Sequence, residues 1–181
     1  LTPEQKRYSP YGINVHGGGY VGYEKFARLG FVWVRDYAYT YDWMVRARGN
    51  GEYGGWPWYN KLVATAENNG MLTLPCLMGS MQFDRNKPQS KPAPDEEWRR
   101  NLAHIVATFG TLPAFEIDNE VDGRMDPYGK EYAAYHRVFA EIVKAISPNR
   151  WAVETGVAGI YPEATRKHVL AGDFKNIDVC N

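Results

Sequence analysis

Short apolar runs alternate with longer amphipathic segments along this chain of 181 residues. The short runs are nearly continuous in hydrophobicity, as is typical of parallel strands that are covered on both faces. We predict six such strands, at residues 11–16, 31–37, 71–77, 114–120, 151–157 and 177–180.

Amphipathic segments fill the gaps between the predicted strands. The first two end at Gly30 and Gly70, and glycine directly after a helix is a common C-terminal signal. The third opens with Pro94 and three acidic residues, which suit the first turn of a helix and its dipole. The predicted helices span residues 21–29, 59–69, 94–109, 130–146 and 163–171.

Strands that alternate with helices predict an α/β fold with a parallel sheet, here as one domain over residues 1–181. Two architectures fit this order: a doubly wound open sheet, or part of a closed (β/α)₈ TIM barrel. The glycines of residues 17–19 follow the first strand, but they lack the spacing of a dinucleotide or P-loop motif. Their spacing weakens a nucleotide-binding interpretation.

The connections between elements are unequal in length. Residues 38–58 and 78–93 form long segments after the second and third strands, whereas the turns at Gly30 and Gly70 are tight. In a (β/α)₈ barrel, the loops after the strands build the active site and the opposite turns serve stability. The asymmetry therefore favours the barrel.

Composition narrows the function classes. The 21 acidic and 21 basic side chains cancel, which argues against a nucleic-acid binder and is compatible with a neutral polymer as partner. No apolar run approaches the roughly 18 residues of a membrane helix. Aromatic residues make up 14% of the chain, and many lie in segments rich in Gly and Pro, where stacking on sugar rings explains them better than core packing.

Cysteine and histidine indicate neither a disulfide framework nor a metal site. Cys76 and Cys180 lie in apolar runs, so we expect buried free thiols. The four histidines have no metal-ligand spacing, and His104 and His136 fall within predicted helices. We expect no metal and no cofactor. The polar N-terminus lacks the apolar core of a signal peptide, but a processed signal leaves no trace, and we expect a secreted or periplasmic location.

One segment carries the most specific chemistry. The fourth predicted strand ends in Asn119-Glu120 and runs into a polar loop. A partly shielded carboxyl group at the end of a strand has a raised pKa and serves as a proton donor near neutral pH. The preceding amide can bind a substrate hydroxyl beside the reacting carbon. Glu116 and Asp118 alternate with Glu120 along the strand, and their depth favours structural hydrogen bonding.

These residues resemble the clan A glycoside hydrolases, whose barrels carry an Asn-Glu pair at the end of strand four. The resemblance implies that Glu120 is the acid/base and that a second Glu on strand seven is the nucleophile. It also implies that Arg35, in the segment Val-Trp-Val-Arg-Asp, supports the charge of that nucleophile. The first strand is similar to that of family 39 and its neighbours. A retaining mechanism follows, with carboxyl groups about 5–5.5 Å apart.

Other residues have a substrate-binding and a plain structural interpretation. Trp56 and Trp58 form a sugar-stacking platform at the end of the loop after strand two, or they dock that loop onto the barrel. His16 ends strand one at the presumed active face, and Tyr37 lies just beyond Arg35. Glu154 lies within the fifth predicted strand, where it could face the barrel interior in a structural, substrate-contact or catalytic role.

The chain ends before strands seven and eight, so we expect a fragment of a barrel of about 250 residues. Its partner would be the C-terminal part of the same barrel, and this fragment alone would be inactive. The leading hypothesis is hydrolysis of a β-linked oligosaccharide or polysaccharide. The alternatives are a non-catalytic carbohydrate-binding barrel and a doubly wound α/β enzyme that acts on a small molecule.

Overall fold

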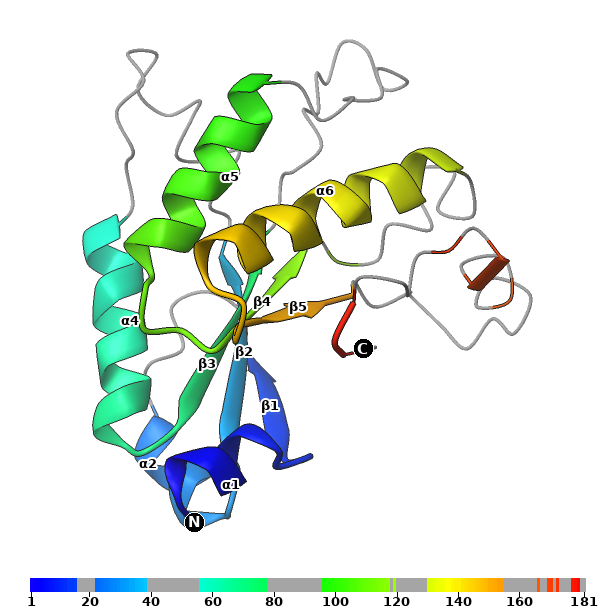
Figure 1. The fold of residues 1–181 in the computed structure, drawn as a ribbon. Coiled ribbons are helices and arrows are strands. Elements are labelled where there is room, and N and C mark those ends of the chain that lie inside the picture. Colours follow the sequence, from blue (N-terminus) through cyan, green and yellow to red (C-terminus); the bar gives the residue numbers. More distant parts are fainter. Residues whose placement is uncertain are drawn as a thin grey trace, which may run out of the picture.

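A computed structural model describes residues 1–15, 22–38, 56–77, 96–117, 119, 130–154, 166, 169–170, 172 and 177–179. Its strands are β1 (Gly12–Val15), β2 (Trp33–Ala38), β3 (Leu72–Leu77), β4 (Ala114–Ile117) and β5 (Trp151–Val153). Its helices are α1 (Pro3–Arg7), α2 (Tyr23–Arg28), α4 (Trp56–Asn68), α5 (Glu96–Thr108) and α6 (Lys130–Ile146). Figure 1 shows the longer helices outside one parallel sheet.

The strands pair in the order β1-β2-β3-β4-β5, and every pair is parallel. A doubly wound sheet reverses its strand order at a switch point, whereas a barrel adds each strand beside the preceding one. The doubly wound alternative is therefore wrong. The predicted sixth strand continues the series through a parallel bridge between Val153 and Val179.

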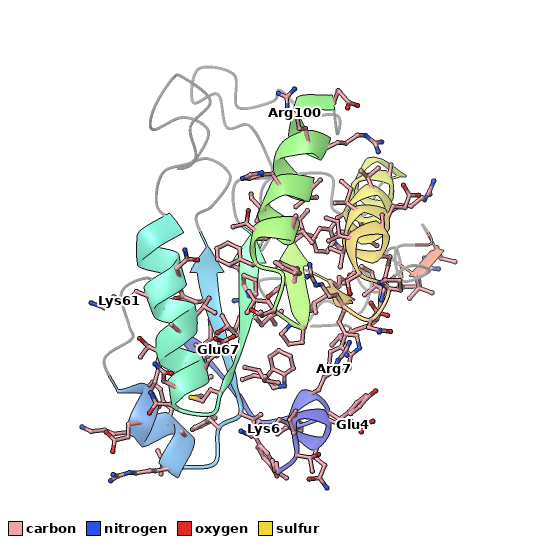
Figure 2. The ribbon with its side chains drawn as sticks, turned by 60° about the vertical axis from the view of Figure 1, so that its left-hand side comes forward. Glu4, Lys6, Arg7, Lys61, Glu67 and Arg100 are labelled. Carbon is pink, nitrogen blue, oxygen red and sulfur yellow. The ribbon has the colours of Figure 1, made fainter. Side chains whose placement is uncertain are left out.

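The helices cover one face of this sheet, which we call the outer face. Leu62 of α4, Ile105 of α5 and Phe139 of α6 are almost completely buried, and they join Val34 and Phe115 of the strands in one core. The opposite sides of the helices are polar. In Figure 2, Lys61 extends from α4 into solvent, and Arg100 lies at the far end of α5.

The sequence pattern placed the C-terminal ends of α2, α4, α5 and α6 within one residue. Helix α6 has the predicted bounds. Gly30 and Gly70 have φ angles of 89° and 71°, the left-handed conformation that glycine adopts without steric cost. Both predicted glycine turns are confirmed, and they lie at the strand N-termini, where a tight turn brings each helix back to the sheet.

Three predicted boundaries are wrong. Strand β4 ends at Ile117 and β5 at Val153, so both are shorter than their apolar patterns. Helix α4 begins at Trp56, which puts Trp56 and Trp58 in its first turn and not in the preceding loop. The segment Trp-Pro-Trp resembles a loop, but proline is well tolerated in the first turn of a helix, because its missing N–H has no intrahelical partner there.

Helix α1 was not predicted, because its residues are polar and exposed. Thr2 and Gln5 form a capping box that satisfies backbone N–H groups at its start. At its other end, Lys6 donates to the carbonyl of Gly70 over 2.6 Å, and Arg7 donates to the carbonyl of Asn149. Helix α1 therefore fastens the turns that lead into β3 and β5, beneath the N-terminal ends of the strands (Figure 1).

A buried phenol lies between α2 and β2. Tyr23 is 1% exposed, and its hydroxyl has no hydrogen-bond partner within the described part of the chain. Burial raises the pKa of Tyr23, and the negative charge of Asp36 raises it further. The folded protein therefore keeps this phenol protonated at a pH where the unfolded chain ionises it.

We predict that Tyr23→Phe lessens the loss of stability at alkaline pH. A raised pKa makes the free energy of unfolding fall as the pH rises above about 10, the ordinary value for tyrosine. The variant lacks the group that titrates, so its free energy of unfolding should fall less between pH 9 and about 11. Urea unfolding at several pH values measures this, with the exposed Tyr11→Phe as control. Identical pH dependence in Tyr23→Phe and the unmodified protein would contradict the prediction.

Candidate active site

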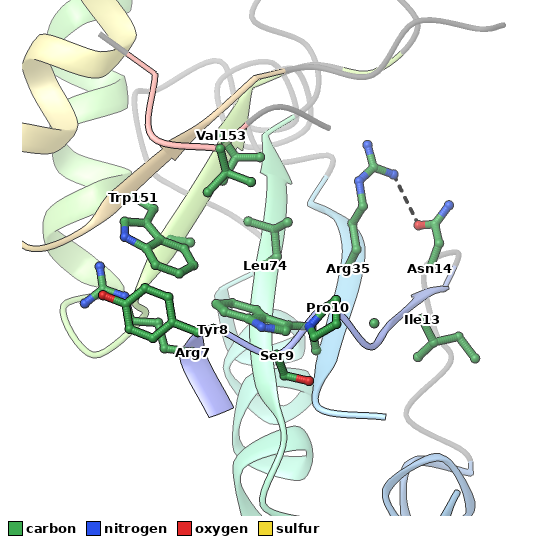
Figure 3. A pocket seen from close by; sticks show the side chains of 14 residues that line it. Arg7, Tyr8, Ser9, Pro10, Ile13, Asn14, Arg35, Leu74, Trp151 and Val153 are labelled. Carbon is green, nitrogen blue, oxygen red and sulfur yellow. Dashed lines mark hydrogen bonds between the residues drawn. The ribbon is translucent and has the colours of Figure 1, made fainter. Parts of the chain in front are cut away.

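The inner face of the sheet, opposite the helices, surrounds a cavity of about 600 Å³ (Figure 3). Residues from both edges of the sheet line it: Asn14 of β1 on one side and Val153 with Val179 on the other. The sheet is therefore curled, as in the wall of a barrel. The inner face also carries Trp33, Leu74 and Ala114.

The cavity has an aromatic end near the strand N-termini. The rings of Trp33 and Trp151 stack with centroids 6.2 Å apart, and Tyr8 meets Trp151 edge-on at 5.3 Å. The guanidinium of Arg7 lies 4.4 Å from the centre of the Trp151 ring. Such cation–π and aromatic contacts contribute about 0.5–1.5 kcal/mol each. These contacts build a floor at the end away from the predicted active site.

Toward the strand C-termini the inner face becomes polar, and Arg35 is the centre of this region. Its Nε donates to Oε2 of Glu116 over 2.5 Å, and its Nη2 donates to Oε1 of the same carboxylate over 2.8 Å. Glu116 is completely buried and Arg35 is 13% exposed. This two-bond geometry is the strongest form of arginine–carboxylate pairing.

Arg35 also holds the predicted substrate-binding amide. Its Nη2 donates to Oδ1 of Asn119 over 2.9 Å, and Asn119 is buried. On the other side, Nη1 donates to Oδ1 of Asn14 over 3.2 Å, as drawn in Figure 3. Sγ of Cys76 lies 3.4 Å from Nη2 as a weak acceptor. Side chains from β1, β3 and β4 thus meet at the guanidinium of Arg35 on β2, together with the amide that follows β4.

The position of Asn119 requires a bend after β4. Glu116 and Asn119 are three residues apart, so a continued strand would direct them to opposite faces. Both nevertheless contact Arg35, and the strand ends between them, at Ile117. Asp118 and Glu120 lie outside the described residues, so their predicted alternation with Glu116 stays a prediction. The structural hydrogen bonding predicted for Glu116 is confirmed.

The remaining predicted site residues are only partly described. Glu120 and His16 lie outside the described residues. Tyr37 has its backbone in β2, paired with Cys76, but its side chain lies outside the description. The same holds for the side chains of Trp56 and Trp58. Their roles stay predictions.

Glu154 is buried and follows directly after β5, so it does not lie within the strand as predicted. Its backbone N–H donates to the carbonyl of Val179. Its role as a substrate contact stays a prediction.

Sequence reasoning missed Asn14, which pairs with Arg35 in the register of β1 and β2. A lone polar side chain in an otherwise apolar strand was the available signal.

The expected free thiol is confirmed for Cys76, which is buried, while Cys180 lies outside the description. His104 is exposed on α5 and His136 is buried in α6, so both lie within helices as predicted.

The described residues contain no group of three or more His, Cys, Asp or Glu side chains that could hold a metal ion. They also contain no helix with the length and apolarity needed to cross a membrane.

Several solved glycoside hydrolases have a similar fold. A family 39 glycoside hydrolase from Bacteroides cellulosilyticus WH2 aligns with 94% of this chain and 37% of its own, at 23% identity and a TM-score of 0.70. A β-galactosidase from the Antarctic haloarchaeon Halorubrum lacusprofundi aligns over 94% and 39%, at 11% identity and a TM-score of 0.66. Xylanase 10B from Thermotoga petrophila RKU-1, solved with xylobiose, aligns over 92% and 55%, at 15% identity and a TM-score of 0.61.

No family model and no curated protein sequence matches the chain. At these identities the likeness is one of fold, and the chain spans 37–55% of the three proteins. The fold is therefore that of part of a (β/α)₈ barrel, the fold of the three glycoside hydrolases named above. This conclusion agrees with the sequential order of the parallel strands.

We predict that Arg35→Met strongly destabilises the fold. The substitution leaves the Glu116 carboxylate buried without its cation, and breaking a buried ion pair typically costs about 3–5 kcal/mol. Arg35→Lys keeps the charge but not the planar fork, so its loss should be smaller. Chemical denaturation measures both, with the exposed Arg100→Met on α5 as control. Equal stability of Arg35→Met and Arg100→Met would show that the pair contributes nothing.

Proposed function

We propose that the protein containing this chain hydrolyses β-linked glycans by a retaining mechanism, with Glu120 as general acid/base. The observation that carries the proposal is the hydrogen bond from Arg35 to Asn119 at the C-terminal end of β4. This bond holds the Asn119 amide at the C-terminal end of the strands, where the loops of a (β/α)₈ barrel build the active site. Glu120 is the residue directly after Asn119.

The chemistry of the network supports this role for the Asn-Glu pair. The charge of Arg35 is already matched by Glu116, so the guanidinium can orient Asn119 without placing an unbalanced cation in the site. In the proposed reaction, Glu120 protonates the leaving glycosidic oxygen. It then removes a proton from the water that hydrolyses the glycosyl-enzyme intermediate.

The nucleophile in this proposal is a glutamate from a seventh strand, which the C-terminal part of the same barrel would supply. The cavity supports this arrangement, because both edges of the curled sheet flank it and its walls near the strand N-termini are aromatic and apolar. Strands seven and eight would pair with those edges and fill the space between them, as barrel strands do.

The substrate class rests on the similar structures and on composition. Two of the proteins named above are a β-galactosidase and a xylanase, and we carry over only the class of β-linked glycan. A net charge of zero suits a neutral sugar polymer. The sugar-stacking role of Trp56 and Trp58 belongs to this proposal, as do the substrate contacts of Tyr37, His16 and Glu154.

We predict that Glu120→Gln in the full-length protein lowers kcat/KM for an alkyl β-glycoside by about 100-fold or more. General acid catalysis contributes about 10²–10⁴-fold, and glutamine cannot donate the proton. A dinitrophenyl leaving group departs without protonation, so its glycosylation step should lose far less. Steady-state and burst kinetics on both substrates measure this difference.

The matched control is Glu67→Gln, which changes an exposed glutamate on α4. It should leave both rates unchanged. Equal loss on both leaving groups, or no loss in Glu120→Gln, would remove Glu120 as the acid. If the full-length protein binds glycans but turns over neither substrate, it is a non-catalytic carbohydrate-binding barrel.

A further inference from the structure

Glu116 does more in this network than neutralise a charge. Its carboxylate accepts from two different nitrogens of Arg35, Nε and Nη2. Two bonds to one planar group define both its position and its rotation. Because Glu116 is completely buried, water does not compete for these bonds.

The fixed guanidinium in turn directs one specific N–H at Asn119. Nη2 carries two hydrogens in the plane of the group, and the one on the side of Nε points at Oε1 of Glu116. The direction of the second hydrogen is therefore set as well, and it is donated to Oδ1 of Asn119. Sγ of Cys76 lies at the longer distance of 3.4 Å from Nη2. Rotation of the guanidinium would move this N–H away from the amide.

The contact also decides which end of the Asn119 amide faces the site. Arginine has only donors, so the amide must turn its oxygen toward Arg35. Its NH₂ group is then directed away from Arg35 and can donate to an oxygen atom. Without the guanidinium, both flipped states of the carboxamide would be accessible.

We propose that Glu116 is a positioning residue, which acts through Arg35 to hold the Asn119 amide as a hydrogen-bond donor toward a sugar hydroxyl. This inference rests on the proposed function and deepens it, since it names what orients the substrate-binding amide. A plain structural ion pair would affect stability alone. A positioning residue also affects recognition of the hydroxyl beside the reacting carbon.

The first test needs no catalytic activity. In the full-length protein labelled with [¹⁵N]asparagine, the side-chain NH₂ of Asn119 is assigned from its absence in Asn119→Asp. We expect one dispersed pair of resonances in the unmodified protein. In Glu116→Gln the pair should shift and broaden, because glutamine offers one acceptor where the carboxylate offers two. Glu67→Gln should leave it unchanged.

Glu116→Asp and Arg35→Lys extend the test to variants that retain the charges of the pair. Each breaks the two-bond geometry, the first by shortening the side chain and the second by removing the fork. Both should shift the same Asn119 resonances. An unperturbed NH₂ pair in a folded Glu116 variant would overturn the proposal.

The second test uses kinetics. The substrates are an aryl β-glycoside that the protein turns over and its analogue without the hydroxyl beside the reacting carbon. Glu116→Gln should lower kcat/KM on the parent glycoside by about 10–100-fold, the effect of misplacing a contact group. On the deoxy analogue the loss should be under about threefold. Asn119→Ala should show the same losses of kcat/KM on the two substrates. The double variant of Glu116→Gln and Asn119→Ala should lose little more kcat/KM than either single variant.

The outcomes separate this proposal from the function on which it rests. Additive losses in the double variant, or equal losses on both substrates, would show that Glu116 does not act through Asn119. If the unmodified protein turns over no glycoside while the Asn119 resonances respond as expected, the proposed function fails and the positioning role of Glu116 stands.

Discussion

The buried pair of Arg35 and Glu116 is the interaction on which the described site depends. An isolated charge inside a protein costs several kcal/mol, and each of these side chains offsets the charge of the other. They come from β2 and β4, which do not pair directly, and the guanidinium crosses over β3 to reach the carboxylate. Any slip in the register of β3 would separate them. The pair therefore ties the chemistry of the site to the correct assembly of three strands.

The curled sheet divides into two ends with different properties. The end near the strand N-termini is aromatic and is fastened by α1, whereas the opposite end carries the polar network. Apolar and aromatic contacts are tolerant of small shifts, but a two-bond ion pair requires accurate placement. A stable floor thus holds the strands in the positions that the polar groups at the opposite end require. This division matches the separation of stability and activity in (β/α)₈ barrels.

Hydrophobic periodicity was enough to predict the parallel sheet, the extent of α6 and the glycine turns at Gly30 and Gly70. These features follow from local rules, since a helix repeats every 3.6 residues and a left-handed turn needs glycine. A polar pair after an apolar strand was the signal that predicts Asn119 as a site residue. The sequence does not indicate that Asn119 contacts Arg35, which only the structure shows.

Local rules could not predict where β4 ends or that Arg35 contacts Glu116. The pattern of Glu116, Asp118 and Glu120 continues the alternation of β4, so nothing in it marks the end of the strand at Ile117. The contact between Arg35 and Glu116 joins residues 81 positions apart, and only the strand register makes them neighbours. A residue sequence states which groups are present, whereas pairing across strands decides which of them meet.

The fastening of α1 has a consequence for how the chain folds during synthesis. Arg7 bonds to a carbonyl 142 residues later, so the ribosome must deliver most of this sequence before that contact can form. Closing so long a loop is entropically costly and slow. Before that, Lys6 can already hold α1 to Gly70, which lies only 64 positions away. Locking of the N-terminal helix at both contacts would therefore come late, after the helices and central strands have already packed.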